Sequence, residues 1–399
     1  MQIEKTDNKT VVYLTGRIDS IFPDATKDEL FELAKNTEGI LEINLKGVNY
    51  VSSAGLRLFL KIKQEKKDKF ILTHMASDVY EIFEITGFTS LLNIEKEPRN
   101  LSIDKCEIIG RGGNGTVYKC GTDEIVKVYE DRTPLEDIKR EREYAKKAFL
   151  AGVPTAISFD IVNVDGKTGI VFENLKATTF SKLLMNDPEN REKYELQFAK
   201  LLKEIHTTNV SGEDFPETKN LYLNIADRAL EFYSEKEISE FKRLLNAIPD
   251  RNSIVHGDFN SNNVMMQDGE LMLIDMAEIS KGNPIYDLMN IYFVHVLNIT
   301  LQKGAVQRFL QLSDEISEEL WNTLVRSYFP KATEEDIIFI NQSIRRLSYF
   351  RAGTLPVLFR NIVEEGTVDT FVGGARQNLL PYIDESIEMI KKLDKMLDM

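Results

Sequence analysis

Several features that mark specialised proteins are scarce or missing in this chain of 399 residues. It holds only two cysteines, Cys106 and Cys120, which give neither a disulfide framework nor the spacing of a metal site. The first ten residues are polar and lack the apolar core of a signal peptide. The most apolar later run, residues 288–301, is interrupted by polar side chains and is too short to span a bilayer. We therefore expect a protein of a reducing, cytoplasmic compartment that does not enter a membrane.

A concentration of positive charge is also missing. The formal net charge is −14 and no basic patch stands out, which argues against non-specific binding of nucleic acid. A hydrophobic content of 42% with 29% charged residues is typical of folded globular protein. The length predicts two or three domains. The acidic surface would suit a cationic substrate, although such surfaces commonly serve solubility alone.

Strands and helices alternate through the first hundred residues. The predicted strands cover residues 10–17, 40–45 and 70–73, and the predicted helices cover residues 24–35, 56–67 and 79–86. Alternation at these lengths indicates a small α/β domain with helices packed on a sheet.

Three segments of this region resemble the STAS domain of bacterial anti-sigma factor antagonists. They are Thr-Gly-Arg-Ile-Asp at 15–19, Tyr-Val-Ser-Ser-Ala-Gly-Leu-Arg at 50–57, and Ile-Phe-Glu-Ile-Thr-Gly-Phe at 82–88. The resemblance covers roughly residues 1–96 and implies a domain that docks a protein partner or senses a signal. In that family the loop before the helix carries a phosphorylatable Ser or Thr directly before a glycine. Here Ala54 precedes Gly55, so Ser53 is the nearest hydroxyl and the candidate phosphosite.

Two interpretations of this serine pair remain open. A phosphate at a helix N-terminus would be stabilised by free N–H groups and by the helix dipole, and it would add about two negative charges to a docking surface. Alternatively, Ser52 or Ser53 only caps the helix. No catalytic constellation is present in this half of the chain.

A polar stretch at residues 95–102, which contains Pro98, separates the first pattern from the second. We place the STAS-like domain at residues 1–97 and a second domain at residues 102–399. The centre of this second domain is residues 254–275. Two short apolar strands, 264–266 and 271–274, are joined by a Gln-Asp-Gly turn, with a polar loop before the first strand and Asp275 after the second. Asp258, Asn263 and Asp275 should therefore converge at one end of a hairpin.

This convergence provides the groups that phosphoryl transfer needs: a carboxylate beside an attacking hydroxyl, and an amide and a second carboxylate for hard cations. The loop resembles the H-x-D-x-x-x-x-N catalytic loop of the kinase fold. Gly257 in place of arginine resembles the form of this motif in the aminoglycoside phosphotransferase and choline kinase branch. The resemblance implies an α+β two-lobed fold with a mainly sheet N-lobe at residues 102–175 and a helical C-lobe at residues 176–399. It makes Asp258 the catalytic base and Asn263 and Asp275 the ligands of Mg²⁺. It also gives His206, His256 and Asp287 structural roles.

A glycine-rich segment precedes this centre. Gly110, Gly112, Gly115 and Val117 follow the pattern G-x-G-x-x-G-x-V between two predicted strands, which differs from the strand-to-helix setting of dinucleotide-binding folds. Such a loop lays its backbone over nucleotide phosphates, where a Cβ would block close approach.

Lys127 interrupts an apolar strand at residues 125–129 and needs an anion, which we identify as the α- and β-phosphates of ATP. Its expected partner lies on the helix at residues 135–150. Glu141 and Glu143 are both candidates, and the end of that helix, placed on the family's pattern, favours Glu143. The backbone of Glu173 and Leu175 should meet the adenine edge at the hinge between the lobes.

The expected function is the transfer of the γ-phosphoryl group of ATP to a hydroxyl of a small molecule, with the STAS-like domain for regulation or docking. Two other functions are compatible with the sequence: a protein kinase that phosphorylates Ser53 or a partner's equivalent serine, and a catalytically silent nucleotide-sensing scaffold. No motif names the acceptor. Two irregular spots, residues 349–353 and 373–376, are places where an acceptor pocket could lie.

Overall fold

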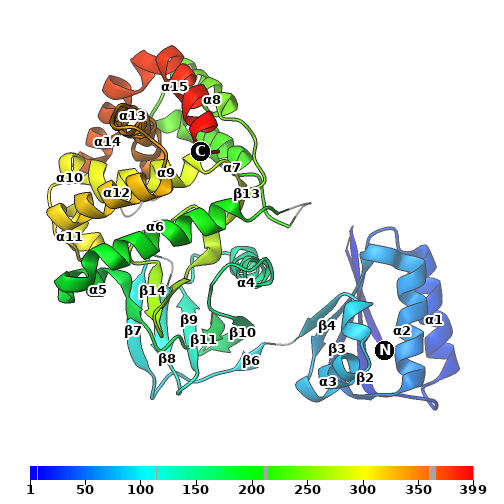
Figure 1. Cartoon of the computed structure of the whole chain (residues 1–399). Coiled ribbons are helices and arrows are strands. Elements are labelled where there is room, and N and C mark those ends of the chain that lie inside the picture. Colours follow the sequence, from blue (N-terminus) through cyan, green and yellow to red (C-terminus); the bar gives the residue numbers. More distant parts are fainter. Residues whose placement is uncertain (7, 97, 114, 211–213, 359–364, 399) are drawn as a thin grey trace. The chain divides into compact units, whose positions relative to one another are not determined.

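The computed structural model describes the chain except residues 7, 97, 114, 211–213, 359–364 and 399. The chain divides into two compact units, Met1–Asn100 and Leu101–Met399, which are shown in Figure 1. The two-residue strand β6 (Arg99–Asn100) is the last element of the first unit in the sequence. No helix in the part of the chain that the structure describes is both long and apolar enough to cross a membrane.

The first unit is an α/β domain, as expected from its sequence. Its sheet has the strand order β1-β2-β3-β4-β5, in which β1 runs antiparallel to β2 and the later neighbours are parallel. The elements are β1 (Gln2–Thr6), β2 (Lys9–Ile18), α1 (Asp24–Asn36), β3 (Ile40–Val51), α2 (Ser53–Lys66), β4 (Phe70–Met75), α3 (Ser77–Ile85) and β5 (Ile94–Lys96). The hydrophobic pattern did not predict β1, because most of its side chains are exposed on an edge strand.

The core of this unit forms between the sheet and the helices. Buried Leu41, Ile43 and Leu45 of β3 contribute to a cluster with Phe59 of α2 and Phe83 of α3. The ring centroids of Phe59 and Phe83 lie 6.0 Å apart. These three apolar side chains alternate with Glu42 and Asn44, so they lie on one face of the sheet, where α2 and α3 pack.

The second unit begins with an antiparallel sheet. Five of its strands pair in the order β10-β11-β9-β8-β7. The elements are β7 (Glu107–Gly112), β8 (Gly115–Lys119), β9 (Glu124–Tyr129), α4 (Leu135–Leu150), β10 (Ser158–Val164) and β11 (Lys167–Glu173). Helix α4 covers the sheet residues Ile161, Ile170 and Phe172 with Ile138. This is the sheet lobe that the kinase resemblance predicted.

The two cysteines differ from the expectation. Cys106 and Cys120 are disulfide-bonded, with their Cα atoms 4.7 Å apart. They flank the β7–β8 hairpin directly outside the paired residues Glu107 and Lys119, so the strand register brings them together although 14 positions separate them in the sequence. The cysteines therefore give no support to the expectation of a reducing compartment, and the cytoplasmic location stays a prediction.

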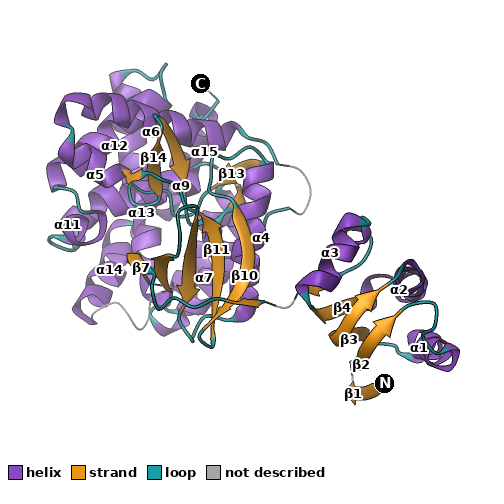
Figure 2. Ribbon diagram, turned by 90° about the horizontal axis from the view of Figure 1, so that it is seen from below, coloured by secondary structure: helices purple, strands orange, loops and turns teal. Residues whose placement is uncertain are grey.

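The rest of the second unit is mostly helical, as Figure 2 shows. Two small sheets lie within it, with the orders β12-β14-β15 and β13-β16. The elements are β12 (Thr178–Thr179), α5 (Phe180–Asn186), α6 (Arg191–Thr207), α7 (Thr218–Arg228), α8 (Glu235–Ala247), β13 (Ser253–Val255), β14 (Val264–Gln267), β15 (Glu270–Leu273), β16 (Ser280–Gly282), α9 (Ile285–Tyr292), α10 (Asn298–Leu301), α11 (Ala305–Leu310), α12 (Asp314–Tyr328), α13 (Glu334–Leu358), α14 (Glu365–Asn378) and α15 (Ile383–Met396). A π-helical turn, Phe293–Leu297, joins α9 to α10. The expected two-lobed α+β architecture is confirmed.

The two spots that we expected to be irregular lie inside helices. Residues 349–353 belong to α13 and residues 373–376 belong to α14. Gly353 and Gly374 lie within these helices, and each lies against a tyrosine side chain where a Cβ would crowd the ring or its hydroxyl. The glycines therefore serve close packing between helices.

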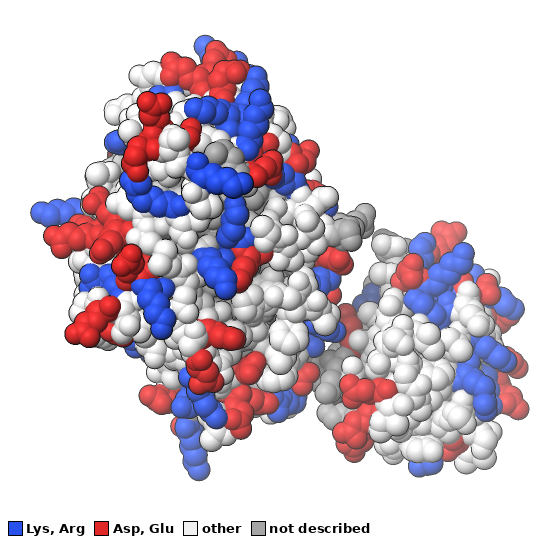
Figure 3. All heavy atoms as spheres, viewed as in Figure 1, with Lys and Arg blue, Asp and Glu red and all other residues white. Residues whose placement is uncertain are grey.

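The charged side chains on the face shown in Figure 3 mix both signs. No extended surface of basic residues appears on this face, in agreement with the low content of Lys and Arg relative to Asp and Glu.

Candidate active site

The loop between β13 and β14 holds Asp258 by hydrogen bonds from within the loop. Asn263 Nδ2 donates to Asp258 Oδ2 at 2.8 Å, and Asn260 Nδ2 donates to Asp258 Oδ1 at 3.1 Å. The same two amides also donate to the backbone carbonyl of Asp258, at 2.9 and 3.0 Å. The carboxylate is therefore fixed in orientation before any substrate arrives, and the structure brings the predicted Asp258 and Asn263 together.

The start of this loop is held by Asp287 of α9, which is fully buried. Asp287 accepts hydrogen bonds from the backbone N–H groups of His256 and Gly257, both at 2.8 Å, and His206 Nε2 lies 3.0 Å from it. Burial opposes the charged form, but these partners outweigh it and lower the pKa of Asp287. The structural roles expected for His206, His256 and Asp287 match these contacts.

Gly257 is required by this arrangement. Its φ is +83°, a conformation that L side chains rarely adopt. A Cβ at this position would lie 2.6 Å from the backbone oxygen of Glu278. The loop thus packs backbone to backbone against the segment that follows β15.

The electrostatic setting of Asp258 is unusual for a carboxyl group. Burial, together with the nearby carboxylates of Glu278 and Asp275, raises the pKa of Asp258 to about 7, against the opposing effects of Arg351 and the Asn263 hydrogen bond. A carboxyl group with a pKa near neutrality can accept a proton from a hydroxyl and release it again at physiological pH.

Asp275 follows β15 and reaches across to the sheet lobe. Its Oδ1 lies 3.3 Å from Lys127 Nζ on β9, and Lys127 Nζ also donates to Glu141 Oε1 of α4 at 2.7 Å. Burial favours the neutral amine, but the two carboxylates outweigh it and raise the pKa of Lys127, which stays protonated. The lysine expected to bind phosphates and the aspartate expected to bind the metal therefore share one site, 148 positions apart in the sequence.

The partner of Lys127 is Glu141, and the preference for Glu143 is wrong. Glu143 is about half exposed, with 52% of its side chain accessible, and lies 3.7 Å from Lys147 one turn further along α4. The sequence contained a signal for the correct choice. Glu141 is spaced three and four residues from Ile138 and Ala145, which lie on the buried face of α4.

The glycine-rich hairpin lies beside this group. Val117 on β8 is the direct cross-strand partner of Lys127 on β9, so the two side chains lie on the same face of the sheet. Gly110 pairs with Val117, and Gly112 pairs with Gly115 at the tip. A Cβ on Gly115 would lie 2.3 Å from the backbone oxygen of Val128. The pattern G-x-G-x-x-G-x-V thus forms a hairpin over β9, as expected.

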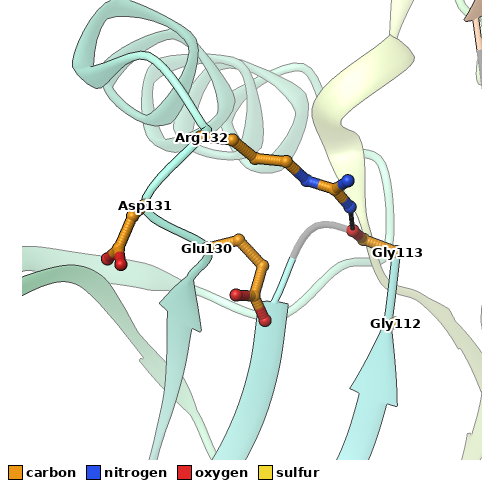
Figure 4. Close-up of a pocket in the computed structure, with 5 residues that line it drawn as sticks. All are labelled: Gly112, Gly113, Glu130, Asp131 and Arg132. Carbon is orange, nitrogen blue, oxygen red and sulfur yellow. Dashed lines mark hydrogen bonds between the residues drawn. The ribbon is translucent and has the colours of Figure 1, made fainter. Parts of the chain in front are cut away.

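A hollow of about 510 Å³ opens next to the hairpin tip and is lined by Gly112, Gly113, Glu130, Asp131 and Arg132. Figure 4 shows the Arg132 guanidinium pointing toward the carbonyl of Gly113, to which it donates at 2.8 Å. Neither Lys127 nor Asp258 lines this hollow. Its lining carries two carboxylates, Glu130 and Asp131, and one guanidinium, Arg132, which is engaged with the carbonyl of Gly113.

The predicted hinge has local hydrogen bonds of its own. The N–H of Leu175 donates to the carbonyl of Glu173 at 3.2 Å, and the N–H of Glu173 donates to Ile157 at 2.9 Å. An adenine bound at this position would have to replace the hydrogen bond between Leu175 and Glu173, which closes a three-residue turn.

The residues present suit a magnesium ion that arrives with a nucleotide. No cluster of three or more His, Cys, Asp or Glu residues able to hold a metal occurs among the described residues. Mg²⁺ in nucleotide sites commonly uses one or two protein oxygens and takes its other ligands from phosphates and water. Asp275, with 39% of its side chain exposed, and the amide oxygen of Asn263 are such oxygens.

Three residues near Asp258 were not among the predicted site residues. Glu278 follows β15 and keeps 46% of its side chain exposed, Arg351 of α13 is 6% exposed, and their charged groups are 3.6 Å apart. Asn290 of α9 accepts a hydrogen bond from Arg351 Nε at 2.7 Å. The only signal in the sequence was Arg351 within an apolar stretch, which the pattern of glycine and aromatic residues led us to assign to an irregular segment.

In the first unit, the two serines at the start of α2 have different positions. Ser52 is the N-cap, and its Oγ accepts a hydrogen bond from the N–H of Ala54 at 3.2 Å. Ser53 is the first residue of the helix and is exposed. The capping interpretation therefore applies to Ser52, whereas the phosphosite at Ser53 stays a prediction.

Similar proteins were found for both units. The first unit matches the STAS domain over residues 1–100. It is 27% identical over 97 residues to a putative anti-sigma factor antagonist, BtrV, of Bordetella bronchiseptica, which covers 24% of this chain and 84% of that protein. It is 28% identical over 100 residues to an anti-sigma-B factor antagonist of Listeria monocytogenes, which covers 24% of this chain and 87% of that protein.

The chain is also similar to solved structures of low sequence identity. A choline/ethanolamine kinase family protein from Mesorhizobium loti superposes with a TM-score of 0.48 at 14% identity, over 72% of this chain and 92% of that chain. The ADP-bound aminoglycoside phosphotransferase APH(2'')-Ib superposes with a TM-score of 0.47 at 14% identity, over 76% of this chain and 98% of that chain. The sequence profile of the phosphotransferase enzyme family, APH, matches residues 105–319, more than half of the chain. The protein therefore belongs to the phosphotransferase enzyme family and carries an N-terminal STAS domain.

Proposed function

We propose that the second unit transfers the γ-phosphoryl group of ATP to a hydroxyl group of a small molecule. The observation that carries this proposal is the contact of Lys127 with both Glu141 and Asp275 at 2.7 and 3.3 Å, since it brings the sheet lobe and the catalytic-loop lobe to one site. A protonated lysine between two carboxylates is poised to exchange one of them for a phosphate oxygen.

Each group then has a definite role. The backbone of the glycine-rich hairpin, at Gly110, Gly112 and Gly115, faces the phosphates, and Val117 packs against the adenine ring. Lys127, held by Glu141, binds the α- and β-phosphates. Asn263 and Asp275 would hold Mg²⁺, which neutralises charge on the phosphates when it is bound. The backbone of Glu173 and Leu175 would meet the adenine.

The chemical step transfers one phosphoryl group and one proton. The acceptor oxygen forms a bond to the γ-phosphorus, the bond from that phosphorus to the bridging oxygen breaks, and ADP leaves. Asp258 accepts the hydroxyl proton, for which its raised pKa and its fixed orientation are suited. Gly257 supports a small acceptor, because protein kinases of this fold carry at that position the arginine that binds a phosphorylated activation loop.

The test is a screen of hydroxylated metabolites and aminoglycosides for ATP consumption by the full-length protein with Mg²⁺. We expect consumption with at least one compound and its loss in Asp258→Asn. Nucleotide binding without any turnover would instead support the silent scaffold.

A second candidate function is phosphorylation of the STAS domain, which the exposed Ser53 favours. It predicts labelling of the first unit by radioactive ATP and Mg²⁺, and loss of the label in Ser53→Ala. The similarity to anti-sigma factor antagonists supports the use of this unit as a docking module for a protein partner.

A further inference from the structure

The charged residue Arg351 is buried in α13, and it lies outside residues 105–319, the part of the chain that matches the family. Only 6% of its side chain is exposed. Burying a guanidinium is costly unless it is paired. An apolar side chain would fill this helix position at a lower cost, so the contacts of Arg351 need an explanation other than stability.

Those contacts converge on one point of the catalytic loop. Arg351 Nε donates to Asn290 Oδ1 at 2.7 Å, and Asn290 Nδ2 in turn donates to the carbonyl oxygen of Gly257. Gly257 directly precedes Asp258. One side of Arg351 therefore restrains, through a single amide, the peptide group that carries the proposed base.

The other side of Arg351 restrains the segment that packs against the same glycine. Its terminal nitrogen lies 3.6 Å from Glu278 Oε2, and the backbone of Glu278 is what a Cβ on Gly257 would meet. Arg351 thus holds both partners of the contact between the catalytic loop and the segment after β15. Asp287, one turn before Asn290 on α9, binds the N–H of the same glycine at 2.8 Å.

We propose that Arg351 is a positioning residue for phosphoryl transfer, which fixes Gly257 through Asn290 and Glu278 through an ion pair and so holds Asp258 at the reacting hydroxyl. This inference rests on the proposed function. It makes the last third of the chain part of the transfer site, although Arg351 itself does not touch the reacting atoms.

The test compares full-length variants in MgATP hydrolysis, with water as the acceptor, and measures kcat and KM separately. Arg351→Met should lower kcat by about tenfold to a hundredfold, because small displacements of a catalytic group have effects of this size. The KM for MgATP should stay within about twofold, since the contacts of Lys127 are untouched. Arg351→Lys keeps the charge and should restore part of the loss.

The matched control is Arg346→Met, which removes an arginine of the same helix whose partner is Glu385 at 2.7 Å, away from the loop. It should leave kcat unchanged. If Arg351→Met does not fold, Glu278→Gln removes the anion at the same contact and should lower kcat several-fold on its own. A lowered kcat that accompanies an equal rise in KM and a fall in Tm in all three site variants would show a purely structural role and overturn the inference.

Two failures can be told apart. If the wild-type protein shows no MgATP turnover that Asp258→Asn removes, either with water or with any acceptor of the screen, the proposed function fails and this inference falls with it. If wild-type turnover depends on Asp258 but Arg351→Met, Arg351→Lys and Glu278→Gln all keep the wild-type kcat, only the positioning role is refuted.

Discussion

The two units bury charge in different ways. In the described part of the first unit, the buried charged residues are Glu42 and Lys66. Glu42 accepts from Thr73 at 2.8 Å and pairs with Lys9 of the neighbouring strand, and Lys66 donates to the carbonyl of Thr37. In the described part of the second unit, the buried charged residues are Glu141, Glu195, Asp287 and Arg351. Asp287 binds the catalytic loop directly and Arg351 reaches it through Asn290, whereas Glu141 pairs with Lys127 and Glu195 with Thr323.

This difference indicates where charged residues are buried for a reason other than stability. A buried ionic network is no better for stability than well-packed apolar residues of the same volume. Its concentration around Asp258 therefore indicates a site, whereas the ordinary core of the first unit indicates a domain that works through its surface. Perturbing the network should affect activity strongly, and perturbing the first unit should affect local stability only.

The largest effect is expected from the base itself. Asp258→Asn should lower kcat for ATP consumption by about 10²–10⁴-fold, the usual contribution of a positioned base. Its affinity for MgATP, measured by calorimetry, should stay near that of the wild type. An unchanged rate would remove Asp258 from the mechanism and weaken the contrast between the units.

The support beneath the loop should matter for stability. Asp287→Ala leaves two backbone N–H groups and His206 without their buried partner, so the free energy of unfolding of the second unit should fall by about 3–5 kcal/mol. Urea denaturation measures this loss. Asp287→Asn, which keeps one acceptor oxygen, is the control and should lose less.

The two glutamates of α4 offer a matched pair. Glu141→Gln should weaken MgATP binding by about tenfold to a hundredfold, because a hydrogen bond between charged groups is worth about 1.5–3 kcal/mol. Glu143→Gln removes only an exposed pair and should change binding by less than about twofold. Equal effects of the two substitutions would contradict the assignment of Glu141.

The pH dependence sharpens the assignment of the base. Asp258 must be ionised to accept a proton, and its pKa of about 7 lies above the ordinary value of 3.8. The value of kcat/KM should therefore rise with pH, about tenfold per unit below pH 7, and level off above it. Glu278→Gln removes one of the carboxylates that raise this pKa, so the midpoint should move to lower pH. A midpoint near pH 4 in the wild-type protein would argue against this environment.

The smallest effect is expected in the first unit. Ser52→Ala removes the N-cap of α2 and should lower the stability of this unit by about 1 kcal/mol. Ser53→Ala, at an exposed position, should leave stability nearly unchanged. Neither substitution should alter the MgATP hydrolysis rate of the full-length protein, and a change in that rate would show that the first unit acts on the second.

The sequence predicted the elements whose pattern is local. The α/β alternation of the first unit, the hairpin of β14 and β15, and helix α4 all follow from hydrophobic spacing. Among the motif residues, Asp258 contacts Asn263 and Asp275 contacts Lys127. What could not be predicted depends on contacts between distant segments. The disulfide depends on the hairpin register, and the contact of Arg351 with Asn290 depends on the packing of α13 against α9.

The choice between Glu141 and Glu143 lies between these cases. It was decided by which face of α4 meets the sheet, and the apolar spacing of Ile138 and Ala145 already indicates that face.

The close approach at Gly257 has a practical consequence for protein engineering. Because the main chain of Glu278 occupies the space next to its α-carbon, a mutant library randomised at position 257 would return mostly inactive clones. Directed evolution toward other acceptors should therefore hold this glycine constant and diversify residues on helices that border the site.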